Sequence, residues 1–227
     1  MKPLVFKNRT SEVFKISFSA ILLALILLSS FISRFLTIFG FLNIEISLVF
    51  ILLSLYLVGF KYSIILTVAR FAIAPLMHPG WLVINYLGGF ILFLVQLFFI
   101  FIFILIHYLL NKATNKYNGI MFVISLILTM LATTILISTL NTFYFNTLYY
   151  GALGAIQNLS LSETIKAYNA FPLFFGIKNY YLGSYVFYIS FNLINLTINL
   201  VLISIIIFLD YKTKFLSRMV PNCHNKY

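Results

Sequence analysis

Long apolar stretches recur along this chain of 227 residues, and they constrain its fold more than any other feature. Six of them are expected to form helices, over residues 14–37, 44–59, 62–77, 81–110, 120–143 and 185–209. A helix of about 20 apolar residues spans the hydrocarbon of a bilayer. Only 8% of the residues are charged, whereas about 25% is usual for a soluble domain. The sequence therefore predicts an all-α integral membrane protein with six transmembrane helices. It is a single domain over residues 1–227, with short tails at about 1–13 and 211–227.

Lysine and arginine collect on alternate connections between these stretches. Of 15 such residues, we place Arg34, Lys166 and Lys178 outside, Arg70 within a span, and the others on the side that holds both termini. Basic residues favour the cytoplasmic side, so we expect a multi-pass protein of the cell membrane with both termini in the cytoplasm. The net charge of +11 flanks the spans and forms no continuous groove, which disfavours a nucleic-acid partner. Anionic lipid head groups are the expected neighbours of the inner set.

The connection over residues 144–183 is too long for a simple turn. It is rich in polar and aromatic residues and in glycine, and Ser160 followed by Glu163 is typical of a helix start. We therefore predict short helices that fold over the outer face as an ordered extracellular segment, since long ordered loops over a cavity often carry function. A flexible extracellular loop is the alternative. A shorter outer break is expected at His78-Pro79-Gly80.

Two ionisable side chains fall at membrane depth and are the first candidates for a binding site. Arg70 lies well inside the third predicted helix, and Glu45 lies near the outer end of the second. Ionisable groups inside a membrane are costly and usually face a cavity or a partner. Either residue could contact a polar ligand. The structural alternatives are an ion pair, or an Arg70 side chain whose donors are satisfied by neighbouring carbonyl groups.

Amide and aromatic side chains extend the candidate ligand-binding set. An amide offers both donors and acceptors, so it can bind a heterocycle edge or simply bridge two helices. Tyrosines could stack on a flat ligand, or belong to the aromatic belt at the membrane interface. Beside Glu45 and Arg70, the candidates are Asn85, Asn141, Asn192, Asn195, Tyr144 and Tyr149.

Several chemistries have little support in the sequence. No Walker-type glycine loop is present, so the chain is not expected to hydrolyse ATP. The three histidines are far apart, which predicts no metal site. No carboxylate pair and no Ser-His-Asp arrangement is readable, so we expect neither an enzyme nor a bound cofactor beyond a transported ligand.

The order of these features resembles the S components of energy-coupling factor transporters, most closely the riboflavin-binding type. On the first helix, Lys15-Ile16-Ser17 leads into Ala20 and Ala24. The second helix opens with Ile44-Glu45-Ile46-Ser47, where the family often has an acidic residue, a hydrophobic residue and serine. The resemblance covers roughly residues 15–209.

Two further runs carry the likeness to the riboflavin type. Asn141-Thr142-Phe143 is followed by Tyr149, and Phe191-Asn192-Leu193-Ile194-Asn195 lies on the last helix. The sequence departs from that type at three positions. Ser190 and Thr147 stand where proline is usual, and Asn195 stands where the riboflavin type has lysine.

The resemblance implies a function and a set of partners. The chain would capture a small water-soluble vitamin from outside, with riboflavin as the first expectation. A transmembrane T component would dock on Ala20 and Ala24, and two cytoplasmic ATPases would drive uptake. Alternatives are an S component for another vitamin or a nucleobase-like ligand, or a structural or other transport protein of the membrane.

Overall fold

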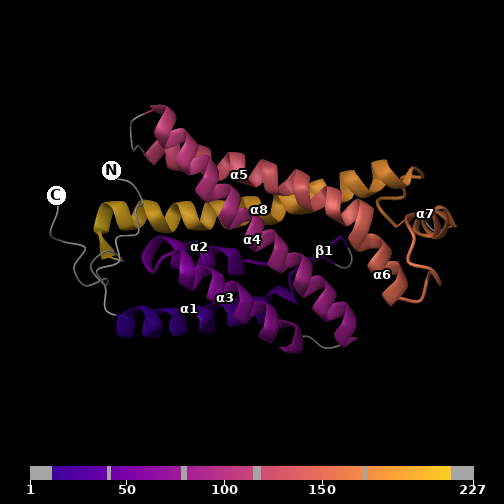
Figure 1. The fold of residues 1–227 in the computed structure, drawn as a ribbon, viewed down its shortest axis with the longest axis horizontal. Coiled ribbons are helices and arrows are strands. Elements are labelled where there is room, and N and C mark those ends of the chain that lie inside the picture. Colours follow the sequence, from indigo (N-terminus) through magenta and orange to yellow (C-terminus); the bar gives the residue numbers. More distant parts are fainter. Residues whose placement is uncertain (1–11, 40–41, 78–80, 115–118, 171–172, 216–227) are drawn as a thin grey trace.

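The computed structural model describes residues 12–39, 42–77, 81–114, 119–170 and 173–215. Helices laid side by side along its long axis dominate the structure (Figure 1). Within the described residues, five segments are long and apolar enough to cross a membrane, which is the pattern of an all-α multi-pass membrane protein. They contain the helices α1 (Glu12–Ser33), α3 (Phe60–Ile73), α4 (Leu82–Thr114), α5 (Gly119–Leu140) and α8 (Tyr180–Thr213), and the segments of α3 and α5 continue to Met77 and Ala152.

The sixth apolar stretch forms a shorter helix at the centre of the bundle. Helix α2 covers Ser47–Leu57, whereas the sequence predicts a helix over 44–59. Its 11 residues give a length of about 16 Å, about half of the hydrocarbon thickness. It contacts α1, α3, α4 and α8, and eight of its residues are buried. A helix that is apolar on all sides is expected to be enclosed in this way.

A short hairpin separates α1 from α2 and was not predicted. The expected first helix, 14–37, ends at Ser33 instead. Strand β1 (Thr37–Ile38) then pairs antiparallel with β2 (Leu42–Asn43). The Ser33 hydroxyl donates to the Ser30 carbonyl oxygen at 2.7 Å, and such local bonds compete with the helix ladder near its end. The hairpin feeds residues 44–46 directly into the start of α2.

The fifth predicted helix continues further than 143. A five-residue π-helix, η2 (Asn141–Phe145), links α5 to α6 (Asn146–Ala152). Helix α8 begins at Tyr180, five residues before the predicted start, with the Asn179 side chain accepting a hydrogen bond from the Leu182 backbone N–H. The predicted 144–183 segment therefore contributes its two ends to the long helices, and only residues 153–179 form the connection.

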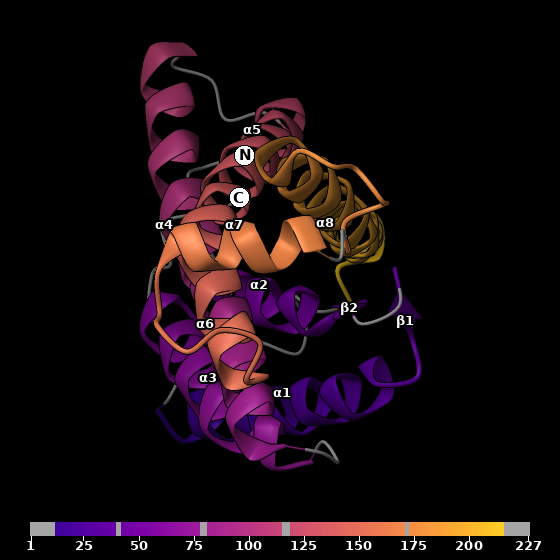
Figure 2. The same ribbon diagram turned by 90° about the vertical axis from the view of Figure 1, so that its right-hand side faces the viewer.

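Within that connection, the predicted short helix is confirmed. Helix α7 covers Leu161–Ala170, and the Ser160 hydroxyl caps it by accepting from the Glu163 N–H at 3.3 Å. It lies across one end of the bundle (Figure 2). The start of α1 and the end of α8 lie at the opposite end (Figure 1). The predicted break at His78–Gly80 lies outside the described residues. A 3-10 turn, η1 (Ala74–Met77), extends α3 towards it.

Two groups of apolar side chains hold the bundle together. The larger one centres on α2 and includes Leu22, Ile26, Ile51, Phe99 and Leu196. The smaller one is aromatic and lies under α7. There the Tyr168 hydroxyl donates to the Ile177 carbonyl oxygen at 2.5 Å. A side chain at Gly183 would meet that hydroxyl at 2.6 Å, so this glycine permits the close packing of α7 on α8.

Candidate functional site

Glu45 lies at the junction between the hairpin and α2, where it joins four elements. Its Oε1 accepts from the Ser30 hydroxyl of α1 at 3.0 Å. Its Oε2 faces Arg70 Nη2 of α3 at 3.4 Å. Both ionisable side chains are buried, Glu45 being 5% and Arg70 3% exposed. The two side chains form a buried ion pair, which is the structural alternative to a ligand contact that the sequence left open.

Helix α8 completes the arrangement around Glu45 through two asparagines. Asn195 Oδ1 accepts from the Glu45 backbone N–H at 2.9 Å. Asn199 Nδ2 donates to the carbonyl oxygens of Glu45 and Asn195, both at 2.8 Å. Residues four apart lie on one helix face, so these two asparagines of α8 bind the backbone N–H and the carbonyl oxygen of Glu45. We call Ser30, Glu45, Arg70, Asn195 and Asn199 the Glu45 cluster.

The Glu45 cluster leaves hydrogen-bonding capacity unused. Arg70 Nε and Nη1 and Asn199 Oδ1 are buried and have no hydrogen-bond partner among the described residues. Gln96 of α4 behaves similarly beside the cluster. Its Nε2 donates to Ser47 Oγ at 2.8 Å, and its Oε1 has no partner in the described part of the chain. Unpartnered buried groups cost free energy, so a polar atom placed beside them would offset that cost.

A second buried polar group joins η2 and α6 to α8. Asn146 Nδ2 donates to the hydroxyl oxygens of Tyr180 and Ser184, both at 3.1 Å. Asn146 Oδ1 accepts from the Tyr188 hydroxyl at 2.5 Å. Thr142 and Ser184 hydroxyls lie 2.8 Å apart. We call Thr142, Asn146, Tyr180, Ser184 and Tyr188 the Asn146 cluster.

The π-helix explains why the Asn146 cluster forms here. In η2 the Asn146 N–H bonds to the Asn141 carbonyl oxygen, five residues back. The Thr142 carbonyl oxygen accepts from the Tyr180 hydroxyl at 2.5 Å. A π-helical turn leaves backbone groups for such outside partners, and these turns are frequent at functional sites.

The structure brings some predicted ligand-binding residues together and separates others. Glu45, Arg70 and Asn195 meet in the Glu45 cluster. Asn141 and Asn192 are also buried, and Asn192 Nδ2 lies 3.4 Å from Ser138 Oγ of α5. The Asn192 amide can therefore bridge α8 and α5.

Three predicted residues lie elsewhere. Tyr144 is 67% exposed on η2 and joins neither cluster. Asn85 is half-buried near the start of α4. Tyr149 lies on α6, and its hydroxyl group approaches Gly88 of α4. A Cβ atom built at Gly88 would lie 3.1 Å from that hydroxyl oxygen.

Sequence reasoning missed Ser30, Gln96 and Asn199, and it noted Asn146 as one of several recurring asparagines without placing it in the binding set. Asn199 continues the spacing of Asn192 and Asn195 along one helix face, which is a signal that could have found it. Gln96 interrupts a long apolar run on α4, and a lone amide in such a run is a second readable signal. Ser30 has no such signal, because serine is common within transmembrane helices.

The predicted docking residues Ala20 and Ala24 lie on an exposed face of α1. Large apolar side chains flank them, with Ile21 59% and Leu28 53% exposed. The two alanines thus form a shallow depression in an apolar surface, which lipid or another helix can cover.

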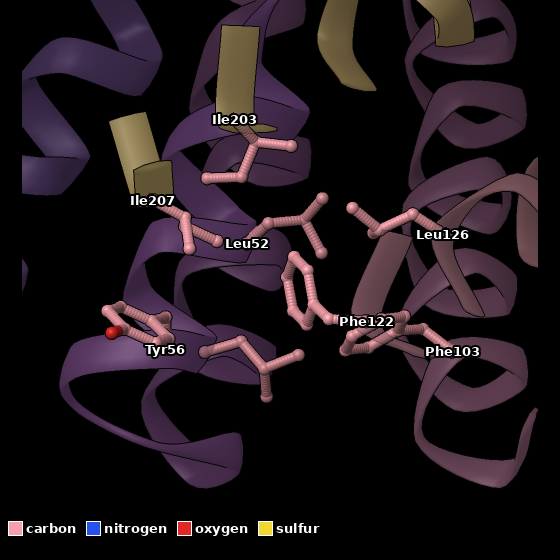
Figure 3. Close-up of a pocket in the computed structure, with 8 residues that line it drawn as sticks. Leu52, Tyr56, Phe103, Phe122, Leu126, Ile203 and Ile207 are labelled. Atoms are coloured by element: carbon pink, nitrogen blue, oxygen red, sulfur yellow. The ribbon is translucent and has the colours of Figure 1, made fainter. Parts of the chain in front are cut away.

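Two hollows in the described structure are lined by residues outside both clusters. An apolar space of about 20 Å³ lies between α2, α4, α5 and α8, lined by residues such as Leu52, Phe122 and Ile203 (Figure 3). That is room for about one water molecule. An open hollow of about 300 Å³ lies on the surface beside α7, lined by Glu163 and Lys166 among others. Among the described residues, no group of three or more acidic, histidine or cysteine side chains gathers as metal ligands would.

Comparison with known proteins finds one informative relative. The chain is 30% identical over 201 residues to a Mycoplasma pneumoniae protein named as an uncharacterised homologue of MG350.1. The alignment covers 85% of this chain and 85% of that protein. No family model matches the chain, and no solved structure matches it.

Proposed function

The chain belongs to the same family as this uncharacterised Mycoplasma pneumoniae protein, and we propose that it is the substrate-capture S subunit of an energy-coupling factor importer. In this proposal the protein lies in the cell membrane with six passes, α2 being the short central one, and both termini in the cytoplasm. It binds a small water-soluble vitamin from outside, with riboflavin as the first candidate.

The observation that carries the proposal is the Glu45 cluster. An ion pair buried among apolar helices is expensive, and a structural pair is expected to have its remaining donors satisfied. Arg70 is 3% exposed and leaves two nitrogens without a partner in the described structure. A polar ligand that accepts from these nitrogens accounts for the cost better than a purely structural role does.

The arrangement of the elements agrees with capture from one side. Glu45 follows the hairpin, which lies at the α7 end of the bundle, away from the start of α1 and the end of α8 (Figure 1). In the proposed topology this is the outer end. Helix α7 and the aromatic residues beneath it then cover the bundle, and exclusion of water strengthens each polar contact around a bound ligand.

Uptake needs partners that supply energy. In the proposal a transmembrane T component docks on Ala20 and Ala24, and two cytoplasmic ATPase subunits hydrolyse ATP. Because both alanines are exposed, replacing both with leucine should leave folding and ligand binding unchanged. The same double variant should lose co-purification with the T component, whereas exposed Leu28→Ala serves as a control on the same helix. Full assembly of the double leucine variant would contradict the docking role.

Mass spectrometry of small molecules released from the gently purified protein tests the proposal directly. Recovery of riboflavin at about one per chain would support the first candidate. A different vitamin or a nucleobase-like compound would keep the S-subunit function with another substrate. A protein that carries nothing and binds no member of a vitamin panel would contradict the proposal in favour of a structural role.

A further inference from the structure

The connection between α6 and α8 exposes two different kinds of surface. Helix α7, which crosses the end of the bundle (Figure 2), exposes the polar side chains of Ser162, Lys166 and Asn169. The loops on either side of it, residues 153–160 and 173–179, instead expose large apolar side chains. These are Leu153 at 57%, Leu159 at 64%, Leu173 at 45% and Phe175 at 49% exposure, and we call them the apolar rim.

Two members of the apolar rim are held in place by the fold. The Leu159 side chain packs so closely over Gly151 of α6 that a Cβ atom there would clash with it. Phe175 packs against Phe39 and Phe187, with ring centroids 5.0 and 5.1 Å apart. Phe175 also has a φ of 53°, which is unusual for a bulky residue and is kept only where surrounding contacts fix it. The fold therefore keeps these side chains partly exposed in fixed positions.

Both loops continue directly from segments that are long and apolar enough to cross a membrane. One loop follows the segment Met121–Ala152, and the other precedes the segment Tyr180–Asp210. The second segment has 31 residues, which as a helix is about 46 Å long. This length is close to the ~40–45 Å thickness of a bilayer with its head groups. A helix that spans that whole thickness begins in the head-group layer, so the loop before Tyr180 lies at the same level.

The charges of the two loops suit this layer. Neither loop contains an acidic residue, and Lys178 is their one charged residue. Lys178 is exposed and lies in the same loop as Leu173 and Phe175. A lysine beside exposed apolar side chains can place its stem along apolar surface and its ammonium group beside a lipid phosphate. Tyr181, 40% exposed on the first turn of α8, is of the kind that concentrates at membrane interfaces.

We propose that the apolar rim inserts into the interfacial layer of the lipid leaflet at the α7 end of the bundle, with Lys178 beside lipid phosphate. Helix α7 then faces water, and lipid anchors the loops at both of its ends. Burial in lipid removes from water the apolar surface that the chain itself leaves exposed. The inference goes beyond the proposed function, because it depends on the membrane character of the fold and not on any transported ligand.

Tryptophan fluorescence of the full chain in vesicles tests the insertion. Trp81→Phe removes the native tryptophan, and Leu153→Trp or Leu173→Trp then places a single probe on the apolar rim. Asn169→Trp, exposed on α7, is the matched control. The vesicles contain phosphatidylcholine and phosphatidylglycerol, with or without bromine on the acyl chains near the glycerol. We expect both rim probes to lose emission to brominated lipid and to resist aqueous iodide, and the control to show the reverse. Rim probes that respond as the control does would overturn the inference.

Cysteine labelling gives a second measurement that introduces a smaller side chain. In a Cys223→Ser background, Leu153→Cys and Leu173→Cys are compared with Asn169→Cys for reaction with a water-soluble maleimide. Apolar surroundings raise the pKa of a thiol and slow its reaction, so the two rim positions should label more slowly than the control in vesicles and equally fast after unfolding in dodecyl sulfate. Equal rates in vesicles would contradict insertion, since the chain itself leaves both positions exposed.

Dilution in lipid separates a bilayer from a second copy of the chain. Protection of the rim positions should stay constant as the ratio of lipid to protein rises, because lipid is always in excess. Protection that disappears on dilution would assign the apolar rim to contact between copies and would overturn the inference. Each of these failures leaves vitamin capture intact, since the mass spectrometry of released ligand tests that function separately.

Discussion

The two buried polar clusters differ in how completely their hydrogen bonds are made. In the Asn146 cluster, one amide is shared among three hydroxyl groups, and none of its five side chains is left with a buried unpartnered atom within the described structure. In the Glu45 cluster, an ion pair with a 3.4 Å contact leaves two guanidinium nitrogens and an amide oxygen unused. Both clusters lie on the same face of α8. The difference in their hydrogen bonding therefore does not arise because one cluster faces the bundle and the other does not.

Under the proposed function, this difference separates a structural role for the Asn146 cluster from a binding role for the Glu45 cluster. A fully satisfied polar network rigidifies its surroundings and specifies one arrangement, whereas a partly satisfied one carries a penalty. The Asn146 cluster fastens the π-helix to α8. The Glu45 cluster retains the penalty, which a ligand can remove.

Breaking the ion pair should have the largest effect on stability. Arg70→Met leaves the buried Glu45 carboxylate with the Ser30 hydroxyl as its hydrogen-bond donor and with no opposite charge from Arg70. We expect the free energy of unfolding to fall by about 3 to 5 kcal/mol, as when one member of a buried pair is removed. Denaturant titration in mild detergent, followed by helical circular dichroism, measures the change.

The companion double variant sharpens that result. Glu45→Gln with Arg70→Met removes both charges, and most of the lost stability should return because no uncompensated charge remains. A double variant as unstable as the single one would show that the pair holds the bundle together, and would place the Glu45 cluster beside the Asn146 cluster as structural.

Removing the shared amide should have an intermediate effect. Asn146→Leu leaves the Tyr188 hydroxyl without its acceptor, and we expect a loss of about 1 to 3 kcal/mol for each buried group left unpaired. Ligand affinity should not change. Asn192→Leu is the control, with a smaller loss because its contact to Ser138 is long, at 3.4 Å. A ligand affinity that falls with Asn146→Leu would break the distinction between the clusters.

The smallest effect is expected at α7, outside both clusters. Hydrogen bonds from the Asn158 side chain and backbone lower the pKa of the Glu163 carboxyl below its ordinary value of 4.5. A lowered pKa in the folded state means that this stabilisation is present above the ordinary pKa and is lost as the pH falls through the folded value. The Asn158 amide resonance should titrate with a midpoint below 4.5, and Glu163→Gln should abolish the transition. A midpoint at or above the ordinary value would contradict the assignment.

Much of the fold could be predicted from local pattern. Long apolar runs predicted α1, α3, α4, α5 and α8, because in a membrane the backbone must satisfy its own hydrogen bonds. The cap at Ser160 predicted α7. The errors lie where local pattern is silent: the end of α1 at Ser33, the hairpin after it, and the π-helix that carries α5 into α6.

The candidate site could be predicted only in part. Glu45 and Arg70 stand out because charges are rare in apolar segments, and Asn195 because amides are rare there too. Their partners Ser30 and Asn199, and the unused atoms of Arg70, depend on contacts between residues as far apart as 45 and 199. Tyr144 shows the converse, since a predicted binding residue faces outward when the π-helix turns its position away from the bundle interior.

The sequence by itself determined that this chain is a helical membrane protein with two ionisable groups at membrane depth, since hydrophobicity and charge are properties of each residue wherever it lies. Only the tertiary structure decided that these two groups pair, that α2 is short and enclosed, and that one polar cluster is satisfied while the other is not. Hydrogen bonds depend on distance and direction between atoms from separate helices, and no local pattern in the chain encodes them.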